Sequence, residues 1–173
     1  MMHSVARLAN MLGAVAVALA DRLPTDSDSA AMAVITQYPG RTVEELRQAL
    51  ALSHSATVRV VDRLADGGLV RRASAGHGPA LSLHATATGR RRAVRQNAQR
   101  ADELKGAVSH LSAAERRALE PALETILAAL TDDPLGRSIC RLCEAGACRG
   151  HDCPVELRQR ELGHPPPEPT PLG

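Results

Sequence analysis

Polar and apolar positions follow a helical period along residues 53–66, whose sequence is Ser-His-Ser-Ala-Thr-Val-Arg-Val-Val-Asp-Arg-Leu-Ala-Asp. Residues three and four positions apart lie on the same side of an α-helix. The segment therefore predicts a helix with one packed face and one face free to contact a partner. The packed face is predicted to hold Val58, Val61, Leu64 and Ala65, and the free face Ser55, Arg59, Asp62 and Arg63.

A second predicted helix precedes this one. Thr42 and Glu45 have the spacing of a capping box, in which each side chain satisfies the other's backbone N–H at a helix start. Ser53 is a good cap for the helix that follows, and only a few residues separate the two helices. Two helices joined by so short a connection are typical of a helix-turn-helix.

A hairpin is predicted directly after the second helix. Gly67 and Gly68 indicate the helix end, because glycine accepts the left-handed backbone of a helix C-terminus. Two short segments, 69–73 and 81–84, have strand character, and a glycine-containing turn at 76–79 joins them. The resulting pattern is a helix-turn-helix followed by a β-wing.

Four more helices are predicted outside this unit. They cover Ser4–Arg22, Ser29–Tyr38, Ala87–Val108 and the segment from a second capping box at Ser112 to Leu130. Their apolar stripes exceed what the small reading unit can cover, which favours a second copy of the chain as partner. An intramolecular three-helix bundle is the alternative. Pro121 predicts a kink or a break in the last of these helices.

Composition and charge narrow the class of partner. The chain has no Phe or Trp and one Tyr, which argues against modules that stack unpaired bases on aromatic rings. Between residues 41 and 95 there are ten arginines and four acidic residues, whereas the whole chain has a net charge of only +2. A solvated arginine-rich surface remains an alternative, but the charge coincides with the predicted reading helix, so double-stranded DNA is the expected partner.

The N-terminal helix permits a second interpretation. Residues 11–20 form an apolar run that ends Ala-Leu-Ala, which is similar to a secretory signal with its cleavage site. A DNA-reading element directly downstream favours the cytoplasm instead. The run is too short to span a bilayer, so no membrane partner is expected.

All four cysteines lie after the last long helix, at Cys140, Cys143, Cys148 and Cys153. A C-x2-C pair followed by two cysteines at x4 spacing can surround one tetrahedral ion, so the pattern predicts a structural zinc site. A thiol or disulfide redox sensor and unbound thiols are the alternatives. Zinc would order a segment that has few apolar residues of its own.

The reading unit resembles the MarR family of bacterial winged-helix transcriptional regulators. The resemblance rests on residues 52–64, 68–72 and 83–86, and extends over roughly residues 4–130. It implies a mainly α fold with a small β-wing, a winged helix-turn-helix that dimerises through its N- and C-terminal helices. It also implies a reading helix in the major groove, a wing in the minor groove and a response to a small ligand.

Residue by residue, the resemblance implies that Ser55, Thr57 and Arg59 face bases or nearby phosphates, and that Arg63, Arg71 and Arg72 position the DNA backbone. The alternatives are that Thr57 contacts nothing and that Arg63 pairs with Asp62 or Asp66. The family's wing tip has an Asp-Arg-Arg-like sequence. The positions here are His77, Gly78 and Pro79, which argues against a minor-groove contact by the tip.

The sequence thus predicts a homodimeric DNA-binding repressor of a palindromic operator, with no enzyme motif. A zinc- or thiol-redox-responsive regulator is the alternative, and a helical interaction protein that does not bind DNA is a further one. Three parts are expected: a winged-helix and dimerisation domain over 1–131, a cysteine-rich extension over 132–163 and a disordered proline-rich tail over 164–173.

Overall fold

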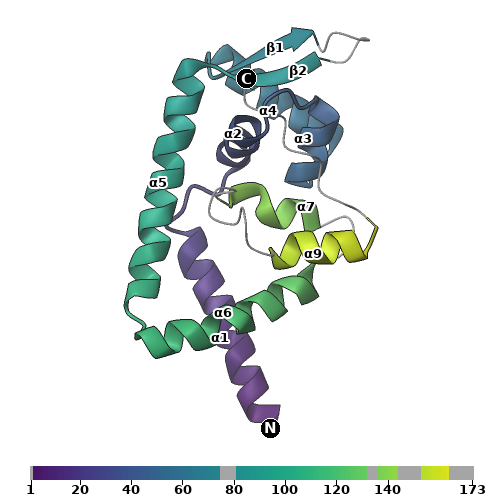
Figure 1. The fold of residues 1–173 in the computed structure, drawn as a ribbon. Helices are drawn as coiled ribbons and strands as arrows, with labels where there is room; N and C mark the ends of the chain where they lie inside the picture. Colours follow the sequence, from purple (N-terminus) through teal and green to yellow (C-terminus); the bar gives the residue numbers. More distant parts are fainter. Residues whose placement is uncertain (1, 75–80, 132–135, 144–152, 164–173) are drawn as a thin grey trace.

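A computed structural model describes residues 2–74, 81–131, 136–143 and 153–163 of the 173-residue chain (Figure 1). The fold is mainly helical, with one antiparallel pair of strands among the described residues. The elements in chain order are α1 (Met2–Ala20), α2 (Ser27–Gln37), α3 (Val43–Leu50), α4 (His54–Asp66), β1 (Val70–Ser74), β2 (Leu81–Ala85), α5 (Ala87–Ser109), α6 (Ala113–Leu130), α7 (Gly136–Ile139), the 3-10 helix η1 (Cys140–Leu142) and α9 (Pro154–Glu161).

Side-chain caps set the starts of five helices. Both predicted capping boxes are confirmed, at Thr42 with Glu45 and at Ser112 with Glu115. Ser53 caps α4 by accepting a hydrogen bond from the Ala56 N–H, as predicted. Asp26 and Thr86 cap α2 and α5 in the same way. Each cap satisfies a backbone donor that has no partner inside the helix, which is why the boundaries follow the sequence closely.

The core lies among α2, α3, α4 and the wing, which together we call the reading lobe. Its largest fully buried side chains are Met32, Ile35, Leu46, Val61, Leu64 and Leu83. Tyr38 packs against the edge of this core, and the Arg41 guanidinium lies 4.5 Å from the centre of its ring. Aliphatic side chains on closely packed helices therefore fill the volume that aromatic residues supply in other cores.

The predicted wing is confirmed as an antiparallel hairpin whose register pairs Val70 with Ala85 and Ser74 with Leu81. Leu83 ties β2 to the α2–α3 connection, because its N–H donates to the Arg41 carbonyl at 2.7 Å and its carbonyl accepts from the Gly40 N–H at 2.9 Å. Gly68 takes the left-handed backbone, with φ of 65°. The middle of β2 is therefore held to the α2–α3 connection by backbone hydrogen bonds.

α5 leaves the wing through a close backbone contact. A Cβ on Gly89 would lie 2.0 Å from the Leu69 carbonyl oxygen and 3.0 Å from Met32 Cε. The Thr86 hydroxyl donates to the Gly68 carbonyl at 2.7 Å, directly beside this contact. The first turn of α5 can approach the start of β1 only because residue 89 has no side chain.

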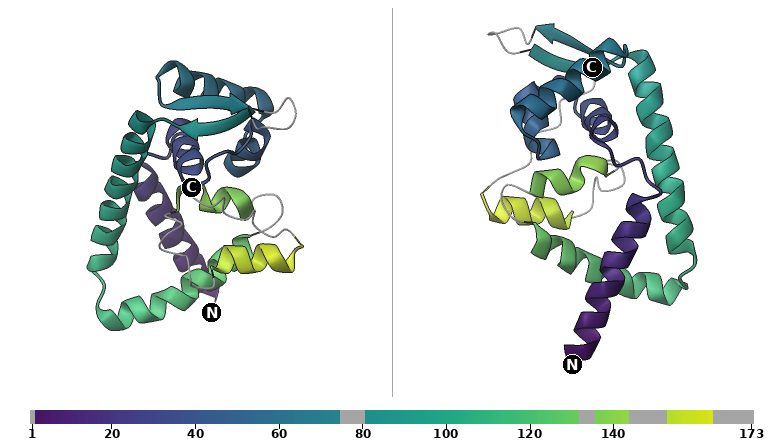
Figure 2. Two further views of the ribbon diagram at one scale, coloured as in Figure 1. Left: turned by 45° about the horizontal axis from the view of Figure 1, so that its top comes forward. Right: turned by 180° about the vertical axis from the view of Figure 1, so that it is seen from behind.

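α6 runs unbroken from Ala113 to Leu130 with Pro121 inside it, so the predicted break is wrong. A proline removes one backbone donor, and neighbouring turns can still hold the helix together. The Thr125 hydroxyl donates to the Pro121 carbonyl at 2.9 Å. α5 and α6 form an elbow that carries α6 to the end of the molecule opposite the wing (Figure 2).

α1 projects from the rest of the chain, with the N-terminus at the end opposite the wing (Figures 1 and 2). Large apolar side chains remain exposed in this single chain, so the intramolecular three-helix bundle does not form. On these three helices they are Val5, Leu8, Met11, Leu12, Val15 and Val17 on α1, Val94, Leu104 and Val108 on α5, and Leu119, Leu123, Ile126 and Leu130 on α6. Among the described helices, none has the length and apolar character needed to cross a membrane.

The C-terminal segment folds back onto the rest of the chain. α7 packs against α3, η1 against α2, and α9 against α6. α9 begins at Pro154, a residue suited to the first turn of a helix. The predicted domain boundaries after residues 131 and 163 stay predictions, and the proline-rich tail lies outside the described residues.

Gly89 gives a test of this packing. Replacing Gly89 with Ala should lower the free energy of unfolding by about 1–3 kcal/mol, because the added methyl overlaps the Leu69 carbonyl. Gly106→Ala is the matched control, since nothing lies within 4 Å of its Cβ position, and it should raise stability by about 0.5–1 kcal/mol through helix propensity. Urea unfolding followed by circular dichroism measures both, and equal effects would contradict the close contact.

Candidate nucleic-acid interface

α4 has the buried face and the exposed face that the sequence predicts, but the residues that make up the buried face differ slightly. The buried positions are Thr57, Val60, Val61 and Leu64. Val58, predicted on the packed face, is only partly buried, and Val60 takes a place in the core instead. His54, Ser55, Arg59, Arg63 and Asp66 are exposed on the opposite side.

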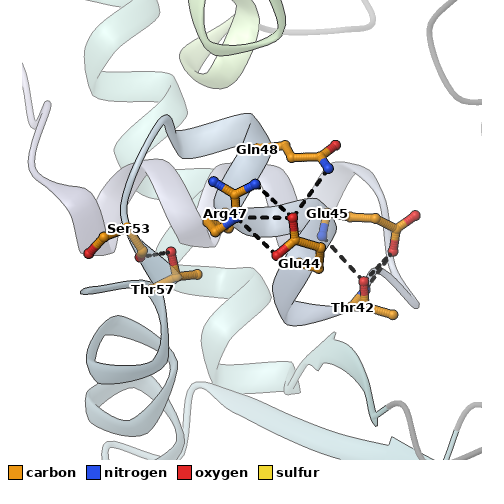
Figure 3. Close-up of polar contacts among 7 residues, drawn as sticks. All are labelled: Thr42, Glu44, Glu45, Arg47, Gln48, Ser53 and Thr57. Carbon is orange, nitrogen blue, oxygen red and sulfur yellow. Dashed lines mark hydrogen bonds and ion pairs between the residues drawn. The ribbon is translucent and has the colours of Figure 1, made fainter. Parts of the chain in front are cut away.

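α3 packs against α4, and a short turn connects the two helices. Figure 3 shows the Thr42 capping box at one end of α3 and, further along, Glu44, whose carboxylate accepts hydrogen bonds from Arg47 and Gln48. The turn to α4 passes through Ala51, which has a left-handed backbone with φ of 53°. A defined turn geometry sets the angle at which α4 leaves α3.

Thr57 does not belong to the exposed face, so its predicted contact with DNA is wrong. Its side chain is completely buried, and its hydroxyl donates to the Ser53 carbonyl at 3.0 Å (Figure 3). A threonine in a helix can satisfy its hydroxyl on the carbonyl four residues earlier, which permits burial. The spacing of Thr57 from Val61 and Leu64 was the available signal, but counting threonine as polar concealed it.

Arg59 and Ser55 extend from the exposed face of α4. Among the described residues, Arg59 has no hydrogen-bond or ion-pair partner. The Ser55 hydroxyl lies 3.3 Å from that of Ser53 at the helix start. A free guanidinium and a hydroxyl one turn apart suit contacts to base edges or phosphates.

Arg63 is paired with a carboxylate from another helix rather than free. Its Nη2 donates to Asp28 Oδ1 at 2.5 Å, and its Nε to Asp28 Oδ2 at 3.4 Å, so its partner comes from α2 and not from Asp62 or Asp66. The hydrogen bonds that Arg63 donates to Asp28, together with the charge of that carboxylate, raise the pKa of Arg63. Pattern analysis missed Asp28, because the pairing depends on how α2 and α4 pack.

The two arginines of the wing also differ in whether they have an ion-pair partner. Arg72 Nη2 donates to Asp62 Oδ1 at 2.5 Å, an ion pair that joins β1 to α4. Arg71 is exposed, and in the described part of the chain it has no such partner. The predicted wing-tip positions His77, Gly78 and Pro79 lie outside the described residues. Of the six predicted DNA-contacting residues, Ser55, Arg59 and Arg71 are thus exposed and, within the described part of the chain, have no carboxylate partner.

Two surface hollows lie away from α4. One, of about 660 Å³, lies between the end of α1 and the second half of α5, and Leu19, Arg22, Asp102, Glu103 and His110 are among its lining residues. The other, of about 520 Å³, lies on α5 and is lined by Ala87, Arg90, Arg91, Val94 and Arg95. Both volumes are in the range of small-molecule sites, which is about 300–1,000 Å³.

Cys140 begins η1, and Cys143 directly follows its last residue. The hydrogen bond between their side chains and the nearby charge of Arg100 lower the pKa of the Cys143 thiol to about 7, against the opposite effect of burial. Cys153 directly precedes α9, and Cys148 lies outside the described residues. No three potential ligands come together within the described ranges, so the predicted four-cysteine zinc site stays a prediction.

Comparison with known proteins supports the predicted family. The model of the MarR family matches residues 24–78, which contain the helix-turn-helix and β1. A comparison with curated protein sequences found no match.

Solved structures share the fold over most of the chain. A MarR family protein from Bacillus stearothermophilus is 24% identical, with a TM-score of 0.67, over 76% of this chain and 99% of that one. Streptococcus pneumoniae FabT in complex with DNA is 16% identical, with a TM-score of 0.61, over 75% and 96%. A MarR family protein of Mycobacterium tuberculosis in complex with p-aminosalicylic acid is 24% identical, with a TM-score of 0.54, over 69% and 97%.

The predicted fold class is therefore confirmed, since a small antiparallel wing follows a helix-turn-helix on a mainly helical scaffold. The family model covers the segment that forms the reading helix, and the structural similarity continues into the helices beyond it. The chain is similar to the MarR family over residues 24–78, and it shares the winged-helix fold of these solved structures over most of its length.

Proposed function

We propose that the protein is a sequence-specific repressor in the cytoplasm that binds a palindromic operator in double-stranded DNA as a homodimer. The observation that supports this most directly is the exposed face of α4, where Ser55 and Arg59 extend into solvent on the side opposite the packed core. Arg71 adds a second free guanidinium on the wing. A helix of this size fits the major groove, and Arg59 has the reach and charge for a guanine edge.

The paired arginines are proposed to contact phosphates. Arg63 and Arg72 are held by Asp28 and Asp62 in exposed ion pairs, and such pairs contribute only about 0–1 kcal/mol to stability. A DNA phosphate can therefore share or replace a carboxylate at little cost. The FabT structure with DNA supports nucleic-acid binding by this fold.

Homodimerisation is proposed through α1 and α6. Their exposed apolar side chains would lose contact with water in a two-fold interface, which is the usual reason for an obligate partner. A two-fold dimer presents two copies of α4 to successive major grooves, about one helical turn of DNA apart. That geometry requires an operator with two inverted half-sites.

A small ligand is proposed as the signal. The hollow between α1 and α5 has an adequate volume, and its lining includes Arg22 and His110 as well as Leu19, Asp102 and Glu103. The relative in complex with p-aminosalicylic acid supports an anionic aromatic compound as the class of effector. Regulation requires that the ligand bind one spacing of the reading helices more tightly than another.

The alternative is a regulator that responds to zinc or to thiol oxidation. The neighbouring thiols of Cys140 and Cys143 favour it, because two sulfurs on one turn can share a metal ion or form a disulfide. In this alternative the DNA-binding output is unchanged and Cys148 and Cys153 complete the cluster.

Arg59→Ala tests the reading helix. Selective binding to the operator should fall by about 1–3 kcal/mol, because a bidentate contact to a base is lost, while dimer mass and helix content stay unchanged. The control is Arg117→Ala, which removes the same charge from exposed α6. Titration of labelled operator and of a scrambled duplex measures both affinities. Undiminished operator selectivity in Arg59→Ala would remove Arg59 from the interface.

The double variant Leu12→Glu with Val15→Glu tests the dimer. Two charges in the exposed stripe of α1 should convert the dimer to monomer, because carboxylates would have to be buried at the interface. Leu81→Glu is the control, since Leu81 is similarly exposed but lies on the wing. Sedimentation velocity gives the masses, and a dimer that persists in the double variant would exclude this face of α1.

Metal analysis tests the zinc proposal. Protein purified under reducing conditions should carry one zinc ion per chain by mass spectrometry, and Cys143→Ser should lose it. A structural ion should resist added chelator, and operator affinity should then stay unchanged. A sensory ion should be removed by the chelator, and operator affinity should change as the ion leaves. A metal-free wild-type protein would rule out the zinc site.

A further inference from the structure

The C-terminal segment after α6 folds back onto the rest of the chain. The Bacillus stearothermophilus protein aligns over 99% of its own length but only 76% of this chain, so about a quarter of this chain has no counterpart there. We call residues 136–143 and 153–163, which contain α7, η1 and α9, the strap. The strap lies between the reading lobe and α6 (Figures 1 and 2).

One part of the strap is attached to the reading lobe. α7 packs against α3, and η1 packs against α2. Leu142 contacts the hydrophobic core, and Ser138 is only 5% exposed. The Gln37 side chain, at the end of α2, donates from Nε2 to the Cys143 carbonyl at 3.0 Å. These contacts hold the strap to the two helices that support α4.

The other part is attached to the dimerisation end. α9 packs against α6 and also against α7. Val155 and Gln159 on α9 are buried, with 5% and 4% of their surface exposed, although the helix is short and strongly polar. Thr131, directly after α6, is also buried. The strap therefore connects the reading lobe with α6 without passing through α5.

Arg100 joins the strap to α5 and to the connection between α1 and α2. It lies in the middle of α5 and is only 5% exposed. Its Nη1 donates to the Leu142 carbonyl at 2.9 Å, and its Nη2 to the Pro24 carbonyl, between α1 and α2, at 3.0 Å. One guanidinium thus holds α5, the α1–α2 connection and the strap at one point.

The surroundings of Arg100 contain no carboxylate partner in the described residues. Its other hydrogen bond goes to Asn97 Oδ1 at 3.3 Å, and burial lowers the pKa of Arg100. A buried charge without such a partner is costly unless several acceptors converge on it. Because one of those acceptors is the Leu142 carbonyl, displacement of the strap would leave Arg100 poorly satisfied. The strap and α5 therefore stabilise each other's position.

We infer that the strap is an intramolecular brace that fixes the angle between the reading lobe and α6, and so the spacing of the two reading helices on DNA. This inference rests on the proposed function. α5 has 23 residues and is about 35 Å long, so a tilt of about 10° would displace one end by about 6 Å. That displacement approaches two base pairs at 3.4 Å each. Helices bend easily on this scale, and a second, separate connection suppresses such a tilt.

The inference is tested with the full-length Arg100→Met variant, which keeps the aliphatic volume and removes the hydrogen bonds to Pro24 and Leu142. Arg95→Met is the matched control, because Arg95 is exposed on the same helix. Hydrogen exchange should become about tenfold faster in peptides from 136–143 and 153–163 of Arg100→Met, with α2 and α4 unchanged. The control should exchange like the wild type.

DNA binding supplies the second readout. Wild-type protein should prefer one half-site spacing over duplexes lengthened or shortened by two base pairs by at least tenfold. Arg100→Met should reduce this preference to about twofold, with little loss of affinity for a single half-site. Val155→Asp provides a second variant, since it unseats α9 and leaves Arg100 intact, and it should have the same effect.

Three results would overturn the inference. One is unchanged exchange in the strap of both variants, which would mean that Arg100 and Val155 do not hold it. Another is faster exchange with an unchanged spacing preference, which would limit the strap to stability. The third is a wild-type protein that binds DNA without any spacing preference. Failure of the wild type to bind any duplex would instead contradict the proposed function, and the exchange data would still show whether Arg100 anchors the strap.

Discussion

Burial of one side of α4 is the constraint on which the interface depends. Val61 and Leu64 are essentially inaccessible to water, and Thr57 joins them because its hydroxyl is satisfied inside the helix. Rotation of α4 about its axis would expose these side chains and bury arginines. At about 25 cal/mol per Å² of apolar surface, such a rotation would cost several kcal/mol. The core therefore determines which residues meet the solvent.

The ion pairs around α4 add orientation without much stability. Asp28 on α2 holds Arg63, and Asp62 on α4 holds Arg72 of the wing. Each pair is exposed, so its net contribution is small, but each restricts a long side chain to one side of the molecule. These arginines have therefore already lost part of their conformational entropy in the free protein, before any polyanion binds. The side chain of Arg59 is not restricted by an ion pair in the described part of the chain, so it can adjust to the surface that it contacts.

Local rules predicted most of the fold. The capping residues Thr42, Ser53 and Ser112 marked helix starts because their hydrogen bonds involve near neighbours in the sequence. The helix-turn-helix and the two strands of the wing followed from period and turn chemistry. Thr57 failed because a binary classification of residues ignores a hydroxyl that bonds its own backbone. Pro121 failed because the remaining hydrogen bonds of α6 tolerate one missing donor.

Contacts between distant segments could not be predicted in this way. Arg100 meets the Pro24 and Leu142 carbonyls, which lie 76 and 42 residues away, and nothing in its helix indicates that it is buried. The pairing of Arg63 with Asp28 is a similar case. The position of the strap depends on such convergent backbone acceptors. Sequence periodicity describes only which face of a helix is apolar, so it identified the elements of the candidate site but not the connections that hold them.

The aliphatic core has a spectroscopic consequence. Tyr38 is the one tyrosine of a chain without tryptophan, so ultraviolet fluorescence comes from a single, known place. That place is the end of α2, where the ring packs against the core beneath Arg41 and adjoins Gln37, the residue that binds the strap. The emission of the unlabelled protein therefore reports on the environment of this junction.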